Sequence, residues 1–132
     1  ASTAQAHRRL LYLQGYSETI ARALYANGTA FLMPSSFEPC GIGQMIAMRD
    51  GQPCIAHAVG GLKDTVIDGV NGFTFSGATL REQADNCVAT VTRAIGMARN
   101  NAEGWSRIVE GARTSRFTWA MSAQRYSESM YG

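Results

Sequence analysis

The chain has 132 residues, of which 45% are apolar and 17% are charged, and its formal net charge is +2. This is the length of one domain with a sizeable core, and its dispersed basic residues give no reason to expect a nucleic-acid partner. No apolar run approaches the roughly 20 residues of a membrane span and no secretory signal is present, so the expected location is the cytoplasm, or the plastid if the source is a plant.

The first third of the chain predicts a strand, a helix and a second strand. Residues 1–9 resemble a disordered lead-in or the end of a truncated helix. The apolar run 10–14 stops at a glycine and predicts the first strand. Ser17 is suited to cap a helix over 18–27, which an Asn-Gly pair ends. The residues 29–33 predict the second strand.

The middle of the chain continues the alternation. A helical pattern covers 44–49, and the apolar run 54–58 predicts a third strand that begins just after a proline, where a missing N–H is tolerated. Residues 62–67 are ambiguous and have room for one helical turn. A double turn signal over 68–72 precedes a short extended run at 73–75.

Helices dominate the C-terminal half of the chain. Apolar residues that step by three and four predict a helix over about 79–99. A further short helix is predicted around 105–112, and both tryptophans are expected in the core. Thr118 is placed to cap a last helix over about 118–132.

This order of elements predicts an α/β fold. Apolar strands separated by helices indicate parallel pairing through right-handed crossovers. Three strands are fewer than a complete doubly wound domain has, so the expected architecture is a partial Rossmann-like parallel sheet with flanking helices and a helix-rich C-terminal half. Residues 1–132 are therefore interpreted as a single domain fragment of a longer protein.

The most specific sequence signals lie in the stretch 31–66. Glu38 follows the second strand, and two glycines, Gly41 and Gly43, open the next helix. Free backbone N–H groups and the positive end of the helix dipole favour an anion such as a diphosphate there, beside a carboxylate that can orient sugar hydroxyls. The alternative is that Glu38 only caps the helix. A dinucleotide fingerprint is excluded, because its third glycine is replaced by Ile46.

A second glycine pair follows the third strand. Gly60 and Gly61 offer another patch of backbone amides, although an ordinary tight turn explains the pair equally well. Because ligands bind at the carboxyl ends of parallel strands, both patches are expected at one edge of the sheet. Tyr16, just after the first predicted strand, would stand at the same edge and can stack on a base, or serve as a core or rim residue.

Other reactive side chains are interpreted as structural. His57 has no partner histidine at a metal-binding spacing, and Cys40 has no visible base that would make it a nucleophile. Asp64 and Asp68 are expected to be solvated or capping acids. The three cysteines cannot all pair, and reduced thiols are the simplest interpretation. We expect no metal.

Several motifs together resemble one enzyme family. The run Pro34–Gly41 (PSSFEPCG), with Gln44 after it, closely resembles the donor-site loop of glycogen and starch synthases. The segment 60–66 (GGLKDTV) matches the next block of that family, and Gly15-Tyr16 matches the turn before the loop. The resemblance is dense over 15–66 and thins through the helical remainder, where the residues around Thr118 resemble the family's C-terminal segment.

This resemblance implies a fragment of a retaining glycosyltransferase with two Rossmann-like domains, the GT-B fold. The fragment would be the latter part of the nucleotide-sugar-binding domain, and a glucosyl unit would pass from a nucleoside diphosphate glucose to an α-1,4-glucan. The donor is a substrate, expected to be ADP-glucose, and no cofactor is implied. Two parts of such an enzyme would lie before residue 1: the N-terminal domain, which holds the acceptor, and the Arg/Lys pair that clamps the diphosphate. The fragment alone is therefore expected to be inactive.

The resemblance also assigns roles to single residues. Glu38 matches the acid beside the donor sugar, for which orientation and charge stabilisation are the favoured role, and Tyr16 matches the aromatic that stacks on the base. The residues that match the donor phosphate and sugar site are Cys40, Gly41, Ile42, Gly43, Gly60 and Gly61.

Three positions depart from the wider pattern. Gly43 stands where close relatives carry a residue with a side chain, and Val59 replaces a threonine before the glycine pair. Ile46 stands where related transferases have a second glutamate, which the synthases also lack. Two alternatives therefore stay open: a related retaining transferase with a sucrose, trehalose or polysaccharide acceptor, and a non-catalytic nucleotide-binding module.

Overall fold

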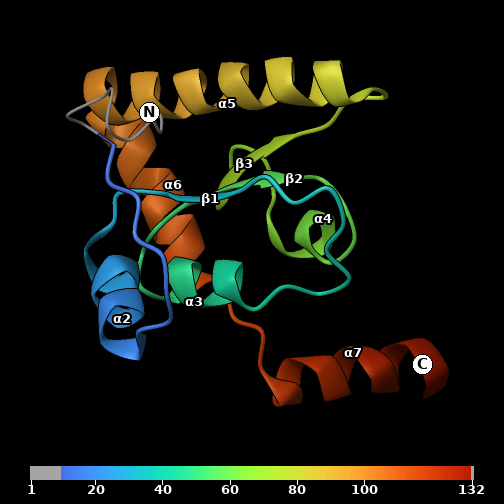
Figure 1. Ribbon diagram of the computed structural model, residues 1–132. Helices are drawn as coiled ribbons and strands as arrows, with labels where there is room; N and C mark the ends of the chain where they lie inside the picture. The colour runs from blue at the N-terminus through green and yellow to red at the C-terminus, as the bar shows by residue number, and fades with distance from the viewer. Residues whose placement is uncertain (1–9, 132) are drawn as a thin grey trace.

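The fold is built on a parallel sheet of three strands in the order β1-β2-β3 (Figure 1). The computed structural model describes residues 10–131, so the predicted lead-in at 1–9 lies outside the described residues. The strands are β1 (Phe31–Met33), β2 (Cys54–His57) and β3 (Gly72–Phe75). Phe31 pairs with Cys54, and Cys54 pairs with Gly72 on its other side. The predicted α/β class and parallel pairing are confirmed.

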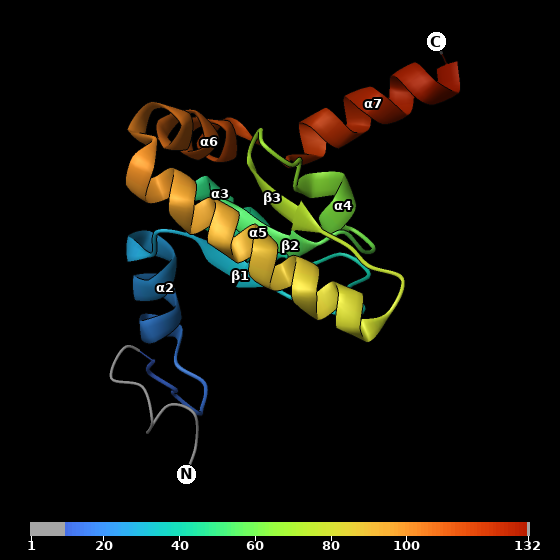
Figure 2. The same ribbon diagram turned by 90° about the horizontal axis from the view of Figure 1, so that it is seen from above.

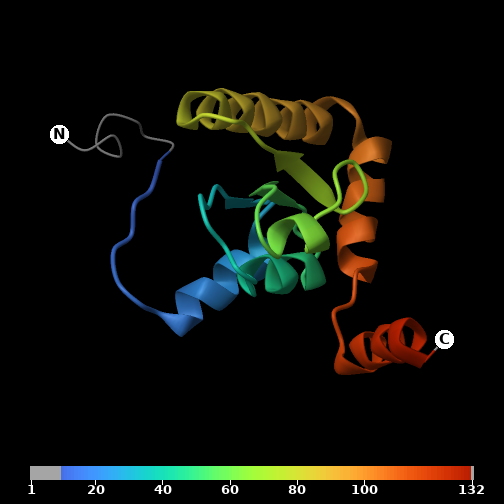
Figure 3. The same ribbon diagram turned by 90° about the vertical axis from the view of Figure 1, so that its right-hand side faces the viewer.

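The identity of one strand differs from the prediction. The apolar run at 10–14 has no regular secondary structure and is exposed, so the first predicted strand is wrong. A strand is stable only beside a partner that accepts its backbone hydrogen bonds, and this segment lies away from the sheet (Figure 3). The third strand is instead the short extended run that follows the 68–72 turn.

Six helices accompany these strands in the described part of the chain, and every helix predicted from the sequence is present. Their bounds are α2 (Glu18–Asn27), α3 (Gly43–Arg49), α4 (Leu62–Thr65), α5 (Leu80–Asn100), α6 (Ala102–Thr114) and α7 (Trp119–Tyr131). Ser17 caps α2 by accepting from the N–H of Ile20 at 3.3 Å. Thr118 Oγ1 accepts from the N–H of Met121 at 3.4 Å, as its predicted capping role requires.

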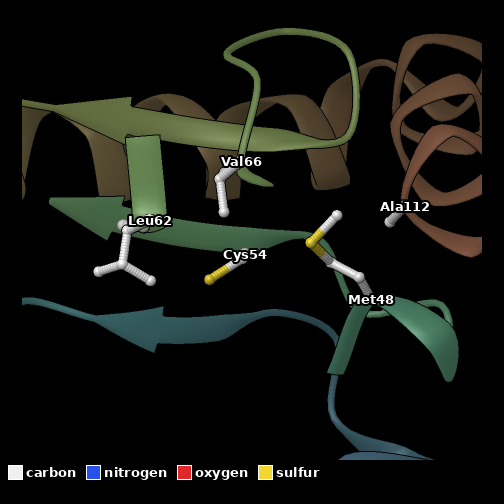
Figure 4. Packing of buried hydrophobic residues seen from close by; sticks show 6 residues of the cluster. Met48, Cys54, Leu62, Val66 and Ala112 are labelled. Atoms are coloured by element: carbon white, nitrogen blue, oxygen red, sulfur yellow. The ribbon is translucent and has the colours of Figure 1, made fainter. Parts of the chain in front are cut away.

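Two apolar clusters hold the helices on opposite faces of the sheet (Figures 2 and 3). On one face Cys54 and Ala56 of β2 pack with residues of α3, α4 and α6, as Figure 4 shows for Met48, Leu62 and Ala112. On the other face a second cluster joins β2 and β3 to α5 and α6; its buried members are Ile55, Phe73, Ala94 and Ile108. Because both faces of β2 are covered, all four of its residues are buried, and the three before His57 are apolar without alternation.

The two long C-terminal helices extend beyond this core. The apolar stripe of α5 is only partly covered, since Leu80, Val88 and Ile95 are exposed while Ala94 is buried. The helix α7 projects from the body of the molecule (Figures 1 and 3). Trp119 at its start is 91% exposed, so the prediction that this tryptophan is a core residue is wrong. No helix in the described residues is both long and apolar enough to span a membrane.

A buried asparagine fixes the turn before β3 against α6. The side chain of Asn71 accepts from the N–H of Ile67 at 2.7 Å and donates to the carbonyl of Thr65 at 3.1 Å. It also donates to Ser115 Oγ at 3.0 Å, at the end of α6. This asparagine thereby fastens the turn to α6 from the inside, and the predicted turn over 68–72 has a structural reason.

A charged pair ties the same turn to α5. Arg93 donates to both carboxylate oxygens of Asp68, with 2.9 Å from Nη1 to Oδ2. Asp68 also accepts from the N–H of Thr74 at 2.8 Å, and the Arg93 guanidinium lies over the Phe73 ring, 5.0 Å from its centroid. The hydrogen bond from Arg93 lowers the pKa of Asp68 below its ordinary value. Asp68 is therefore a structural acid.

We expect Asp68→Asn to reduce the free energy of unfolding at neutral pH by up to about 1 kcal/mol, because the pair is partly exposed and screened. The pKa of Asp68 is lower in the folded chain than in the unfolded chain, so its contribution is present above the unfolded pKa and is lost as the pH falls through the folded pKa. Urea unfolding at pH 7 and at pH 2.5 measures this difference. A penalty of equal size at both pH values would contradict it.

Candidate functional site

Two loops meet at the carboxyl edge of the sheet. The loop 34–42 leaves β1, runs past α4 and enters α3, and the turn 58–61 leaves β2 (Figure 1). The N–H of Gly61 donates to the carbonyl oxygen of Glu38 at 3.2 Å. A Cβ at Gly61 would lie 2.5 Å from the carbonyl oxygen of Cys40, and one at Gly60 would overlap that of Glu38. The predicted juxtaposition of the two glycine turns is confirmed.

Glu38 does not cap the helix that follows it. The N-cap residue of α3 is Ile42, and no side chain makes a capping hydrogen bond there. The carboxylate sits in a loop whose backbone carbonyl is fixed to the neighbouring turn, and the side chain is half-buried. The capping explanation of this acid is therefore wrong. Its assignment as the acid beside a donor sugar stays a prediction.

Backbone N–H groups are free on both sides of the junction. Within residues 10–131, the N–H groups of Gly41, Ile42 and Gly60 donate to no protein acceptor. Gly41 and Gly60 have positive φ values of 74° and 47°, a backbone conformation that turns successive amides toward one side. Backbone amides that are free in such turns can bind a phosphate-sized anion.

His57 has a structural role. It is buried at the end of β2, its Nδ1 lies 2.8 Å from the carbonyl oxygen of Ser35, and its ring stacks on Phe75 at 5.1 Å between centroids. The histidine thus anchors the start of the loop 34–42 to the sheet. No group of three or more His, Cys, Asp or Glu side chains suited to a metal ion occurs in the part of the chain that the structure describes.

Two departures from the family pattern have local structural reasons. A Cβ at Gly43 would lie 3.2 Å from the Tyr25 hydroxyl and 3.3 Å from the Phe31 ring, so α3 is packed tightly against α2 and β1 at this glycine. Val59 packs against the core cluster below β2, where an apolar side chain is favoured. Neither reason was visible in the sequence, because each depends on residues distant along the chain.

Tyr16 is not brought to this junction. Its side chain is 93% exposed, and the surface hollow that it lines is formed only by residues between 13 and 24. The segment before α2, blue in Figures 1 and 2, lies apart from the loop 34–42. Without a strand at 10–14, nothing in the described structure holds this tyrosine at the sheet edge. Its role in base stacking stays a prediction.

The sequence did not single out two polar residues below the junction, Gln44 and Thr65, for a role of their own. Gln44 is fully buried in the first turn of α3, and Thr65 ends α4. Their side chains are joined by a hydrogen bond of 3.2 Å from Gln44 Nε2 to Thr65 Oγ1. A glutamine at a predicted helix start indicates a link between two loops only once its partner, here Thr65 after the turn 58–61, is known.

The three cysteines are free thiols in different environments. Cys40 is exposed in the candidate site, Cys87 is half-buried on α5, and Cys54 is buried in β2. Burial raises the pKa of the Cys54 thiol to about 12. This thiol therefore stays protonated at neutral pH and is a poor nucleophile.

Alkylation should separate these thiols. At pH 8, iodoacetamide is expected to label Cys40 rapidly and to leave Cys54 unlabelled in the native chain, because only a thiolate in contact with solvent reacts. Peptide mass spectrometry over a time course measures both sites, and unfolding in urea supplies the control in which Cys54 becomes reactive. Equal rates at the two sites in the native chain would contradict the burial of Cys54.

Comparison with known proteins identifies close relatives. Residues 2–93 match the family described as Glycosyl transferases group 1. The chain is 43% identical to a glycogen synthase from Desulfitobacterium hafniense, over 93% of this chain and 27% of that protein. It is 38% identical to probable starch synthase 4 from Arabidopsis thaliana, over 94% of this chain and 12% of that protein.

A solved structure agrees with these sequence matches. The catalytic domain of starch synthase IV from Arabidopsis thaliana, bound to ADP and acarbose, superimposes with a TM-score of 0.75. The two share 38% sequence identity over 88% of this chain and 24% of that chain. The chain thus spans about a quarter of the bacterial glycogen synthase and of the solved domain.

Proposed function

Because this chain belongs to the group 1 glycosyl transferases, we propose that it supplies the nucleotide-sugar donor site of an enzyme that extends an α-1,4-glucan with retention. One observation carries the proposal. The loop that holds Glu38 and the turn at Gly60-Gly61 are joined by the hydrogen bond from Gly61 N–H to the Glu38 carbonyl, with free amides on both sides. Homology to glycogen and starch synthases supports it.

In the proposed site each group has a physical task. The amides of Gly41, Ile42 and Gly60 hold the diphosphate of the donor, whose negative charge grows as the sugar departs. Glu38 lies beside the sugar, orients its hydroxyls and stabilises the positive charge that develops at the anomeric carbon. Cys40 and Gly61 shape the loop and the turn around the donor, and Gly43 lets the start of α3, beside the donor, pack closely against α2 and β1.

The proposed donor is ADP-glucose and the proposed acceptor is an α-glucan. The nucleotide assignment is supported by the related starch synthase IV domain, which was solved with ADP bound. Acceptor binding and the diphosphate clamp would come from parts of the enzyme outside these 132 residues, so we propose that these residues alone do not turn over. UDP-glucose with a sucrose-type acceptor is the enzymatic alternative, and donor and acceptor profiling distinguishes the two.

The test is glucosyl transfer from ADP-glucose to glycogen by the gene product that contains this chain. Glu38→Gln keeps the size of the side chain and removes its charge, so kcat should fall by about 10²–10³-fold, which is the usual effect of losing one stabilising group. Glu110→Gln is the matched control, because it makes the same chemical change on the exposed face of α6. Unimpaired transfer by Glu38→Gln would overturn the role of the acid, and transfer from no nucleotide sugar would overturn the function.

A further inference from the structure

The amide of Gln44 is buried where its hydrogen bonds reach both site loops. The residue is 0% exposed, and its Nε2 lies 3.2 Å from the carbonyl oxygen of Cys40 and 3.0 Å from that of Gly41. The same nitrogen lies 3.2 Å from Thr65 Oγ1 on α4. An amide taken out of water is stabilised only when such bonds replace those lost to solvent.

Thr65 carries this connection to the second turn. Its hydroxyl accepts from Gln44 and donates to the carbonyl oxygen of Gly61 at 2.8 Å. The N–H of Gly61 donates in turn to the carbonyl oxygen of Glu38. Gly61 is therefore attached to the loop 34–42 through both of its backbone groups. Its N–H bonds to that loop directly, and its C=O is linked to the loop through the side chains of Thr65 and Gln44.

The orientation of the Gln44 amide is fixed at a cost. Its Oε1 is buried without a hydrogen-bond partner in the described residues, and it lies 2.6 Å from the place where a Cβ on Gly41 would be. The opposite orientation would set the oxygen against the carbonyls of Cys40 and Gly41, which can only accept hydrogen bonds. The amide nitrogen thus donates to the loop carbonyls, while Oε1 stays unpaired. A buried acceptor without a partner typically costs about 1–3 kcal/mol of stability.

We propose that Gln44 and Thr65 are positioning residues of the donor site. Their relay holds the two turns in register, so that the free amides of Gly41, Ile42 and Gly60 point at one diphosphate. This inference rests on the donor-binding function proposed above. Neither side chain needs to touch the substrate, because both act through the backbone of the glycine turns.

The experiment compares four single variants in the gene product that contains this chain. Thr65→Val removes the hydroxyl and keeps the shape of the side chain, whereas Thr65→Ser keeps the hydroxyl and removes the methyl group. Gln44→Glu keeps the shape but replaces the donating NH₂ with an oxygen. Ile108→Val is the control for stability, because it trims a buried side chain in the cluster on the opposite face of the sheet. Amide hydrogen exchange at Gly61, the KM for ADP-glucose, the KM for glycogen and the Tm are measured for each.

Thr65→Val should speed exchange at Gly61 and raise the KM for ADP-glucose by about tenfold, as expected when the buried hydrogen bonding of one hydroxyl is lost. Gln44→Glu should have at least as large an effect on both, because it sets an oxygen against the carbonyls of Cys40 and Gly41. The KM for glycogen should not change. Thr65→Ser should resemble the unmodified protein in Gly61 exchange and in the KM for ADP-glucose. A double variant that combines Thr65→Val with Gln44→Glu should be no worse than the more severe of the two single variants, because both changes break one relay. Ile108→Val should lower the Tm and leave the donor KM unaltered.

Three results would overturn the inference, and they are distinguishable. In the first two, the unmodified protein uses ADP-glucose, but either Thr65→Val changes neither Gly61 exchange nor the KM for ADP-glucose, or Ile108→Val raises that KM as much as Thr65→Val does. In both cases the relay does not position the site, and the proposed function stands. If Gly61 exchange responds as expected but the protein uses no nucleotide sugar, the proposed function fails, and with it the positioning role.

Discussion

Replacing Gly60 with alanine is expected to destabilise the chain by about 3 kcal/mol or more and to abolish donor binding. The new Cβ would overlap the carbonyl oxygen of Glu38, which is backbone and cannot rotate away. The φ of 47° at this glycine adds strain for any residue with a side chain. To relieve both, the turn must withdraw from the loop and break the hydrogen bond between Gly61 and Glu38. Urea unfolding and donor titration measure the two effects.

Two further glycines separate the causes of this effect. Gly69 has a φ of 72° but open space around it, so Gly69→Ala should show conformational strain alone, about 1–2 kcal/mol. Gly61 has no positive φ, but its Cβ would lie 2.5 Å from the Cys40 carbonyl, so Gly61→Ala should show the steric term alone, about 1–3 kcal/mol. If Gly60→Ala cost no more than Gly69→Ala, the close contact between the turns would be refuted.

Gly111→Ala is the second change with a large expected effect, about 2–3 kcal/mol of lost stability. Gly111 lies inside α6, where alanine is normally the better helix former. Its Cβ would overlap the carbonyl oxygen of Val70, in the turn that Asn71 fastens to the same helix. The helix can make room only by moving away from the turn, which weakens the bond from Asn71 to Ser115. Thermal unfolding measures the loss.

The matched control is another helical glycine. Gly96 lies in α5 with nothing within 4 Å of an added Cβ, so Gly96→Ala should stabilise the chain by up to about 1 kcal/mol. The two substitutions are chemically identical and should have opposite signs. Stabilisation by Gly111→Ala would show that α6 is not seated on the turn at Val70.

The sequence predicts the helices and the site edge well, because their signals are local. Ser17 and Thr118 each precede an apolar pattern that winds at helical spacing, and both cap the expected helices. The approach of Glu38 to Gly60 followed from parallel strands, whose carboxyl ends share one edge. A short apolar run is ambiguous by comparison: 10–14 was predicted as a strand and is irregular, whereas 73–75 was predicted only as a short extended run and forms most of β3.

Features that depend on distant partners were not predictable. Gln44 and Thr65 are ordinary helix residues until α3 and α4 are placed side by side. Gly43 was noted only as a departure from the family pattern, whereas its neighbours Tyr25 and Phe31 show that the position is constrained by packing. Trp119 was expected in the core as part of an apolar helix face, yet its side chain is 91% exposed.

The open side of β1 has a practical consequence for work with this chain. Within the described residues β1 pairs only with β2, so its other side presents backbone groups without a strand neighbour, and Leu32 beside them is exposed. Unpaired strand edges next to apolar side chains recruit strands from other molecules and lead to aggregation. Purified samples therefore call for dilute, freshly prepared stocks, and a lysine at position 32 is a reasonable substitution to improve solubility without touching the glycine turns.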